Sequence, residues 1–172
     1  MENKLKQIID ASAGQADKIQ VKINTFIKHV EEFYKKVDDE WLAGCYNEVF
    51  TTGSSSMTIT EESLGTYEVN KKILRIGSYF LEFEPIGTVL IGSDARIDLK
   101  YLNESVKFVR VGNNFENFRD LIEIRVNGRI EKERKEPGEI VWKFVNPQNS
   151  KLIKVTSTSL QDLIADLINA KN

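Results

Sequence analysis

Charged residues recur at every second position in the centre of the chain, where the sequence is typical of β-strands. Glu82 and Glu84 lie two residues apart within SYFLEFE (78–84), and Asp98 and Lys100 lie two residues apart within DARIDLK (94–100). Alternate residues of a strand point to the same face of a sheet, so each pair is predicted to share a face. One interpretation of such a face is cross-strand ion pairing on a solvated surface.

The order of Glu84, Asp98 and Lys100 also resembles the metal-binding core of the PD-(D/E)xK nucleases. The resemblance implies carboxylates that hold Mg²⁺ and a lysine that positions or activates a water molecule. This chain departs from the family pattern because Glu84-Pro85 reverses the usual Pro-Asp order and no basic helix follows. A metal-dependent nuclease using these three residues is the first alternative function.

Two further side chains could do chemistry, and the chain has one of each. His29 is the only histidine and Cys45 the only cysteine. One Cys and one His cannot supply the three or four ligands of a zinc site, and their separation along a helix argues against a catalytic pair. No cofactor, metal site or catalytic residue is therefore predicted from them.

Composition narrows the class of protein. The 172 residues include 24 basic and 26 acidic side chains, a net charge of −2 that gives no reason to expect nucleic acid or an anionic membrane as a partner. A lone cysteine is typical of a reducing compartment, and neither a secretory signal nor a run of about 18 apolar residues is present. The expected location is the cytoplasm.

Helical periodicity dominates the amino-terminal part. Residues 3–13 predict a short helix that Gly14 weakens, and residues 16–41 predict a long amphipathic helix. Its apolar seam includes Phe26, Val30, Phe33 and Val37. Such a seam either packs on the chain's own domain or pairs with a second copy, and the four residues are predicted to contribute to an interaction surface.

From residue 57 the periodicity changes to two, after a segment, TTGSSS (51–56), that is predicted to be a linker. Short turns join the predicted strands, which favours antiparallel hairpins. The predicted strands are 57–61, 64–69, 72–76, 78–84, 88–91, 94–100, 105–111, 120–126, 129–135, 139–145 and 151–155. Asn127-Gly128 is the strongest hairpin signal, and Thr158–Gln161 has the form of a capping box before a short apolar helix.

The predicted fold is therefore α+β. It combines an antiparallel meander of many short strands, strongly curled or two-layered, with a long N-terminal amphipathic helix and a short C-terminal helix. Residues 1–50 form a helical arm and residues 57–172 a β domain with its closing helix, and the two are expected to fold as one unit.

Aromatic residues in a polar loop give one more candidate contact. Phe115 and Phe118 lie within GNNFENFRD (112–120), where they either meet a partner or anchor the loop on the core. We therefore expect a non-enzymatic protein-interaction or accessory module, with a protein partner or a second copy bound through the long helix. The alternatives are the nuclease and a small-ligand carrier with a cavity inside a curled sheet.

Overall fold

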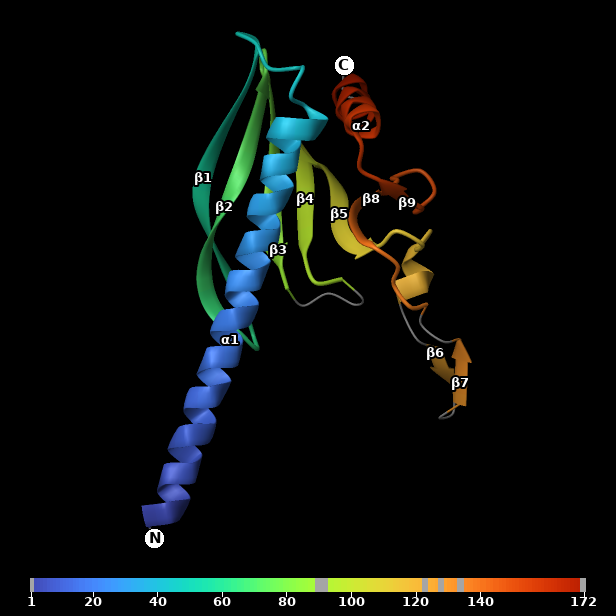
Figure 1. Cartoon of the computed structure of the whole chain (residues 1–172). Coiled ribbons are helices and arrows are strands. Elements are labelled where there is room, and N and C mark those ends of the chain that lie inside the picture. The colour runs from blue at the N-terminus through green and yellow to red at the C-terminus, as the bar shows by residue number, and fades with distance from the viewer. Residues whose placement is uncertain (1, 89–92, 122–123, 127–128, 133–134, 171–172) are drawn as a thin grey trace.

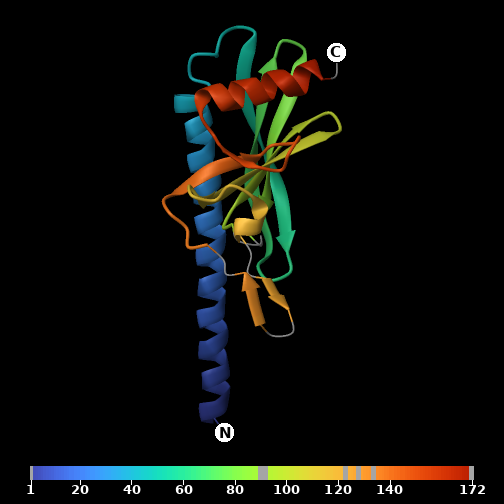
Figure 2. The same cartoon turned by 90° about the vertical axis from the view of Figure 1, so that its right-hand side faces the viewer.

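The computed structural model describes residues 2–88, 93–121, 124–126, 129–132 and 135–170. A long helix, α1, lies against an antiparallel sheet, and a short helix, α2, packs near the end of α1 that lies farthest from the N-terminus (Figures 1 and 2). The helices are α1 (Glu2–Lys36), a π-helical turn η1 (Val37–Trp41), a 3₁₀ turn η2 (Phe118–Leu121) and α2 (Ser157–Asn169). The strands are β1 (Phe50–Glu61), β2 (Gly65–Ile76), β3 (Tyr79–Gly87), β4 (Arg96–Tyr101), β5 (Glu104–Gly112), β6 (Ile124–Val126), β7 (Arg129–Lys132), β8 (Ile140–Val145) and β9 (Leu152–Lys154).

The sheet confirms the predicted α+β class. Seven strands pair antiparallel in the order β1-β2-β3-β4-β5-β8-β9, so the sheet is open and β1 and β9 form its edges. The remaining two strands, β6 and β7, form a separate hairpin. They flank the predicted turn at Asn127-Gly128, which itself lies outside the described residues. Most of the strand predicted at 88–91, residues 89–91, also lies outside them.

Four local predictions are wrong. Helix α1 runs through Gly14 without a break, because a single exposed glycine costs a long helix only about 1 kcal/mol. Residues 51–56 form edge strand β1 rather than a linker, and residues 65–76 form one strand rather than two. The cap of α2 is Thr156 with Ser159, not Thr158 with Gln161.

The main core lies between α1, α2 and the sheet, and Phe33 is at its centre. Its side chain is fully buried and makes edge-to-face contacts with five aromatic rings. These rings belong to Tyr34, Trp41, Phe83, Phe108 and Trp142. Aromatic pairs of this geometry add about 0.5–1.5 kcal/mol each beyond the area they bury.

A partly buried polar cluster, which includes the buried Lys72, joins η1 to the sheet. The Lys72 ammonium lies 2.7 Å from one oxygen of Asp38, and the Tyr46 hydroxyl donates to the other oxygen at 2.7 Å. Nearby, the Tyr34 hydroxyl donates to the backbone carbonyl of Phe83 at 2.9 Å. These contacts fix the helix on the sheet, since a buried charge is stabilised only when it is paired and hydrogen-bonded.

Candidate functional site

The structure brings the three nuclease-like residues together. Glu84 on β3 lies directly opposite Asp98 on β4. The Lys100 amino group is 2.7 Å from a Glu84 oxygen. The Arg96 guanidinium donates to both oxygens of Asp98, at 2.7 and 2.6 Å. All four side chains lie on the face of the sheet opposite the main core.

This arrangement pairs each carboxylate with a cation rather than leaving oxygens convergent on a metal. The bidentate Arg96 contact uses both oxygens of Asp98, whose side chain is only 6% exposed. Glu82 is paired in the same way with Lys71 at 2.9 Å. Among the described residues, no group of three or more His, Cys, Asp or Glu side chains could hold a metal ion. The Arg96–Asp98 pair lies within β4, whereas the pairs of Glu84 with Lys100 and of Glu82 with Lys71 cross between strands and fit ion pairing that supports the sheet register.

The four predicted interaction residues of the long helix lie inside the chain's own core. Phe26 and Val30 are 1% exposed, and Phe33 and Val37 are fully buried. The seam thus packs on the chain's own sheet over this part of α1. A partner that binds α1 must contact another part of the helix.

Phe115 anchors its loop. Its side chain is 1% exposed and packs in a second, smaller core with residues of β5, η2 and β9. The Lys143 amino group donates to the carbonyls of Asn113 and Phe115, at 2.7 and 2.5 Å, and its burial lowers the pKa of Lys143. Phe118 begins η2, and its side chain lies outside the described part of the chain.

His29 and Cys45 lie in different surroundings. His29 Nδ1 is 3.9 Å from the carboxylate of Asp94, which also accepts a 2.6 Å hydrogen bond from Arg110. Cys45 is half-buried in the segment that follows η1, where it packs against the main core. Neither arrangement is a catalytic pair.

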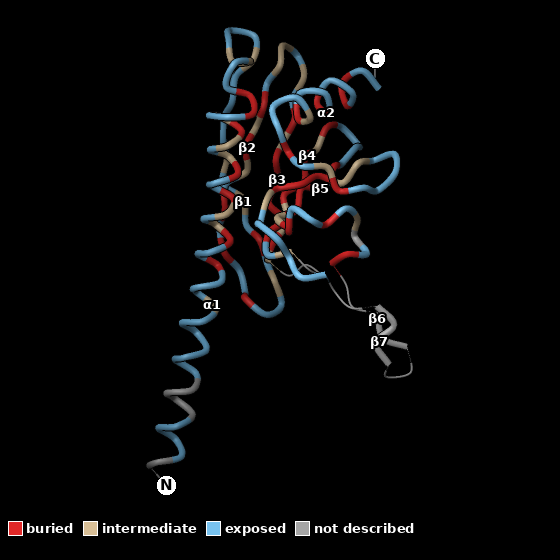
Figure 3. Tube along the Cα trace, turned by 45° about the vertical axis from the view of Figure 1, so that its right-hand side comes forward, coloured by how far each residue is buried: buried red, intermediate tan, exposed pale blue. Residues whose placement is uncertain are grey.

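The first half of α1 extends beyond the sheet, as Figures 1 and 3 show. Residues 4–7 and 12–18 are all exposed, and the first buried residue described on this helix is Ile23. We call residues 2–18 the arm. Its Leu5 side chain is 66% exposed, and Ile8 and Ile9 follow at the helical positions three and four residues later. The arm thus extends the amphipathic helix past the surface that buries it.

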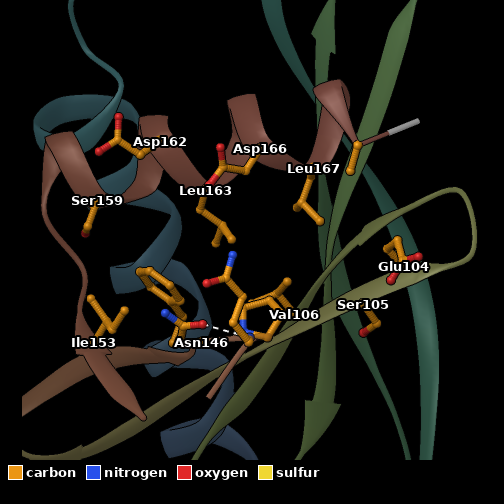
Figure 4. Close-up of a pocket in the computed structure, with 14 residues that line it drawn as sticks. Glu104, Ser105, Val106, Asn146, Ile153, Ser159, Asp162, Leu163, Asp166 and Leu167 are labelled. Atoms are coloured by element: carbon orange, nitrogen blue, oxygen red, sulfur yellow. Dashed lines mark hydrogen bonds between the residues drawn. The ribbon is translucent and has the colours of Figure 1, made fainter. Parts of the chain in front are cut away.

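A groove of about 480 Å³ lies between α2 and the strands β5, β8 and β9 (Figure 4). Its floor is apolar, and Leu163 and Leu167 point into it from α2. Asp162 and Asp166 stand along the α2 rim, and Glu104 lies toward the opposite side. Other lining residues are Ser105, Val106, Phe144, Asn146, Pro147, Gln148, Ile153, Ser159 and Ala170. We call this the α2 groove.

The α2 groove was not predicted from the sequence, although part of the signal was present. The apolar periodicity of the closing helix predicts that one face docks, and Asp162 and Asp166 are four residues apart and therefore neighbours on the helix surface. What periodicity does not show is that α2 meets the sheet incompletely and leaves a hollow. A second hollow, of about 380 Å³, lies between α1 and β1–β2 and has the polar residues Ser54, Ser56 and Asn70 in its wall.

Comparison with protein-family models, with curated proteins and with solved structures found no match to this chain. No helix in the described part of the chain combines the length and the apolar character that a membrane span needs. The features of the chain that bear on its function are the arm, the α2 groove and the ion-paired face.

Proposed function

We propose that the protein is a non-enzymatic interaction module that binds another protein chain through the arm of α1. The observation that carries the proposal is the surplus length of this helix. Its 35 residues span about 52 Å, yet among the residues whose burial is described, the buried ones all lie from Ile23 onward. An amphipathic helix that protrudes with exposed apolar residues is suited to helix-in-groove recognition.

The polar sites support the same conclusion. Glu84 and Asp98, the strongest catalytic candidates, are each held in an ion pair at 2.7 Å or less. The nuclease alternative would need these oxygens to release their cations before they could bind Mg²⁺. The small-ligand alternative assumed a cavity inside a curled sheet, whereas both hollows described above lie between a helix and the sheet.

The proposal is tested with one substitution in the arm and one outside it. Leu5→Asp places a charge on the apolar face of the arm, and Val49→Asp places the same charge at a site that is 60% exposed. We expect Leu5→Asp to lower the mass of the complex measured by light scattering, and Val49→Asp to leave it unchanged. A strictly monomeric wild-type chain that also captures no partner from its native host would contradict the proposal.

A further inference from the structure

We infer that the arm of one copy docks in the α2 groove of a second copy, and that two copies exchange arms reciprocally. The inference rests on the proposed function, because it names the partner of the arm. Its evidence is the chemistry of the two surfaces and their places in the fold.

The two surfaces match in apolar character. The α2 groove follows α2 from Ser159 to Ala170, a rise of about 16 Å. In the arm, Leu5, Ile8 and Ile9 fall within one helical turn of one another on the same face. The exposed Leu5 side chain is the kind of aliphatic group that suits a hollow of about 480 Å³ with an apolar floor.

The charges match as well. Lys4 and Lys6 are exposed and lie about 100° to either side of Leu5 around the helix, so they flank the apolar face. The groove carries carboxylates on both sides, from Asp162 and Asp166 on α2 and from Glu104 across the hollow. A basic-flanked apolar helix is the complement of an apolar groove with acidic rims, and such complementarity selects the partner and speeds encounter.

The chain's own arm cannot fill its own groove. Helix α1 is continuous from Glu2 to Lys36. The first residue of α2 is held at the opposite end of this helix from the arm, because the Ser157 hydroxyl donates to the carbonyl of Trp41, the last residue of η1, at 2.8 Å. Leu5 and Trp41 are therefore separated by about 54 Å of helix. The arm and α2, which forms one wall of the groove, lie at opposite ends of the molecule (Figures 1 and 2). Two antiparallel copies would place each arm tip beside the groove of the other and give a closed pair.

Charge reversal in the full-length chain tests this pairing. An arm variant carries Lys4→Glu and Lys6→Glu, and a groove variant carries Asp162→Lys and Asp166→Lys. Each variant alone has an arm and a groove of the same sign, so we expect its dimer to dissociate at least about tenfold more readily than the wild type. An equimolar mixture restores opposite signs at both contacts, so we expect a mass near twice 19.7 kDa.

A matched control reverses two acidic residues outside the groove, Glu62→Lys with Glu68→Lys, both exposed on the β1–β2 hairpin. It should associate like the wild type, and a thermal melt of each variant tests whether it is folded. If the arm variant dissociates but the groove variant does not, the arm binds another surface: the inference is overturned and the proposed function stands. If Leu5→Asp also leaves association unchanged, the proposed function fails too.

Discussion

At the scale of single residues, three carboxylates on the outer face of the sheet are each held in an ion pair, those of Glu82, Glu84 and Asp98. Arg96 and Asp98 are two residues apart on one strand and form a two-bond pair that is mostly shielded from water, with side chains 23% and 6% exposed. Glu82 and Lys71 form a more exposed pair, at 35% and 26%. Burial decides how much the loss of one member of such a pair lowers the free energy of unfolding, because removing one member of a shielded pair leaves the charge of the other without a partner away from water.

The first prediction follows from this difference. Asp98→Asn should lower the free energy of unfolding by about 2 kcal/mol, because the Arg96 charge loses its partner. Glu82→Gln, the matched control, should cost less than about 1 kcal/mol, as exposed pairs do. Urea unfolding measures both.

Millimolar Mn²⁺ should leave the melting temperature of the wild type unchanged. An increase that Asp98→Asn abolishes would support the nuclease alternative instead.

His29 gives a prediction about pH. Burial, with the nearby Arg110 guanidinium, lowers the pKa of His29 below its ordinary 6.5, although Asp94 acts in the opposite direction. Between the folded-state pKa and about pH 6.5, the unfolded chain binds more protons at His29 than the folded chain does. The free energy of unfolding should therefore fall as the pH falls from about 6.5 toward the folded-state pKa, with a slope of at most about 1.4 kcal/mol per pH unit.

His29→Gln removes this titration and keeps a polar side chain of similar reach. Urea unfolding of wild type and variant over about pH 5–8 compares the two slopes, and we expect the flatter slope for the variant. Equal slopes would show that other groups cause the pH dependence. Asp and Glu titrate with ordinary pKa values near 4, below most of this range.

At the scale of elements, the differences between expectation and structure have local causes. TTGSSS lacks apolar alternation because β1 is an edge strand that is largely exposed in this part, yet it pairs with β2 through Ser56↔Asn70. In β2 the buried positions are odd-numbered up to Val69 and even-numbered from Lys72. In the sequence, this shift in alternation predicts a turn between two strands. In the structure, the β1–β2 register is continuous across these residues, so they belong to one strand.

Gly14 provides the prediction for the arm. A Cβ at this position would have nothing within 4 Å, so Gly14→Ala should stabilise the helix locally by about 1 kcal/mol without a clash. We expect slower amide hydrogen exchange across residues 2–18 and an unchanged melting temperature of the body. Gly14→Pro should do the opposite and raise exchange in the arm, because proline interrupts a helix. If neither substitution alters exchange in the arm, the arm is not an independent helix in solution.

At the scale of the whole molecule, the fold class was predictable because it depends on periodicities that are long and regular. The change from a period near 3.6 to a period of two separates α1 from the sheet, and short turns favour antiparallel neighbours. The α2 groove depends instead on side chains such as Ser105, Phe144 and Leu163, which lie on separate elements and meet only after folding. The same is true of Phe26 and Phe33, whose burial on the sheet rather than on a second copy is a result of tertiary packing.

Phe33 tests whether helix and sheet unfold together, as the prediction of one folding unit requires. Its ring joins α1 to η1, β3, β5 and β8 through Trp41, Phe83, Phe108 and Trp142. Phe33→Ala should lower the free energy of unfolding by about 3–5 kcal/mol, because it opens a cavity at this junction. Phe80→Ala, at a site 57% exposed, makes the same chemical change and should cost about 1 kcal/mol or less.

Two signals report on the long helix and on its junction with the sheet during the same melt. Ellipticity at the helical minimum follows α1, and tryptophan fluorescence follows Trp41 and Trp142 where they pack against Phe33. Because one ring cluster joins the helix to the sheet, we expect the main transitions of the two signals to coincide in the wild type and to shift together in Phe33→Ala. A small helical loss at lower temperature is expected from the exposed arm alone. Separate main transitions would divide the chain into a helical unit and a β unit.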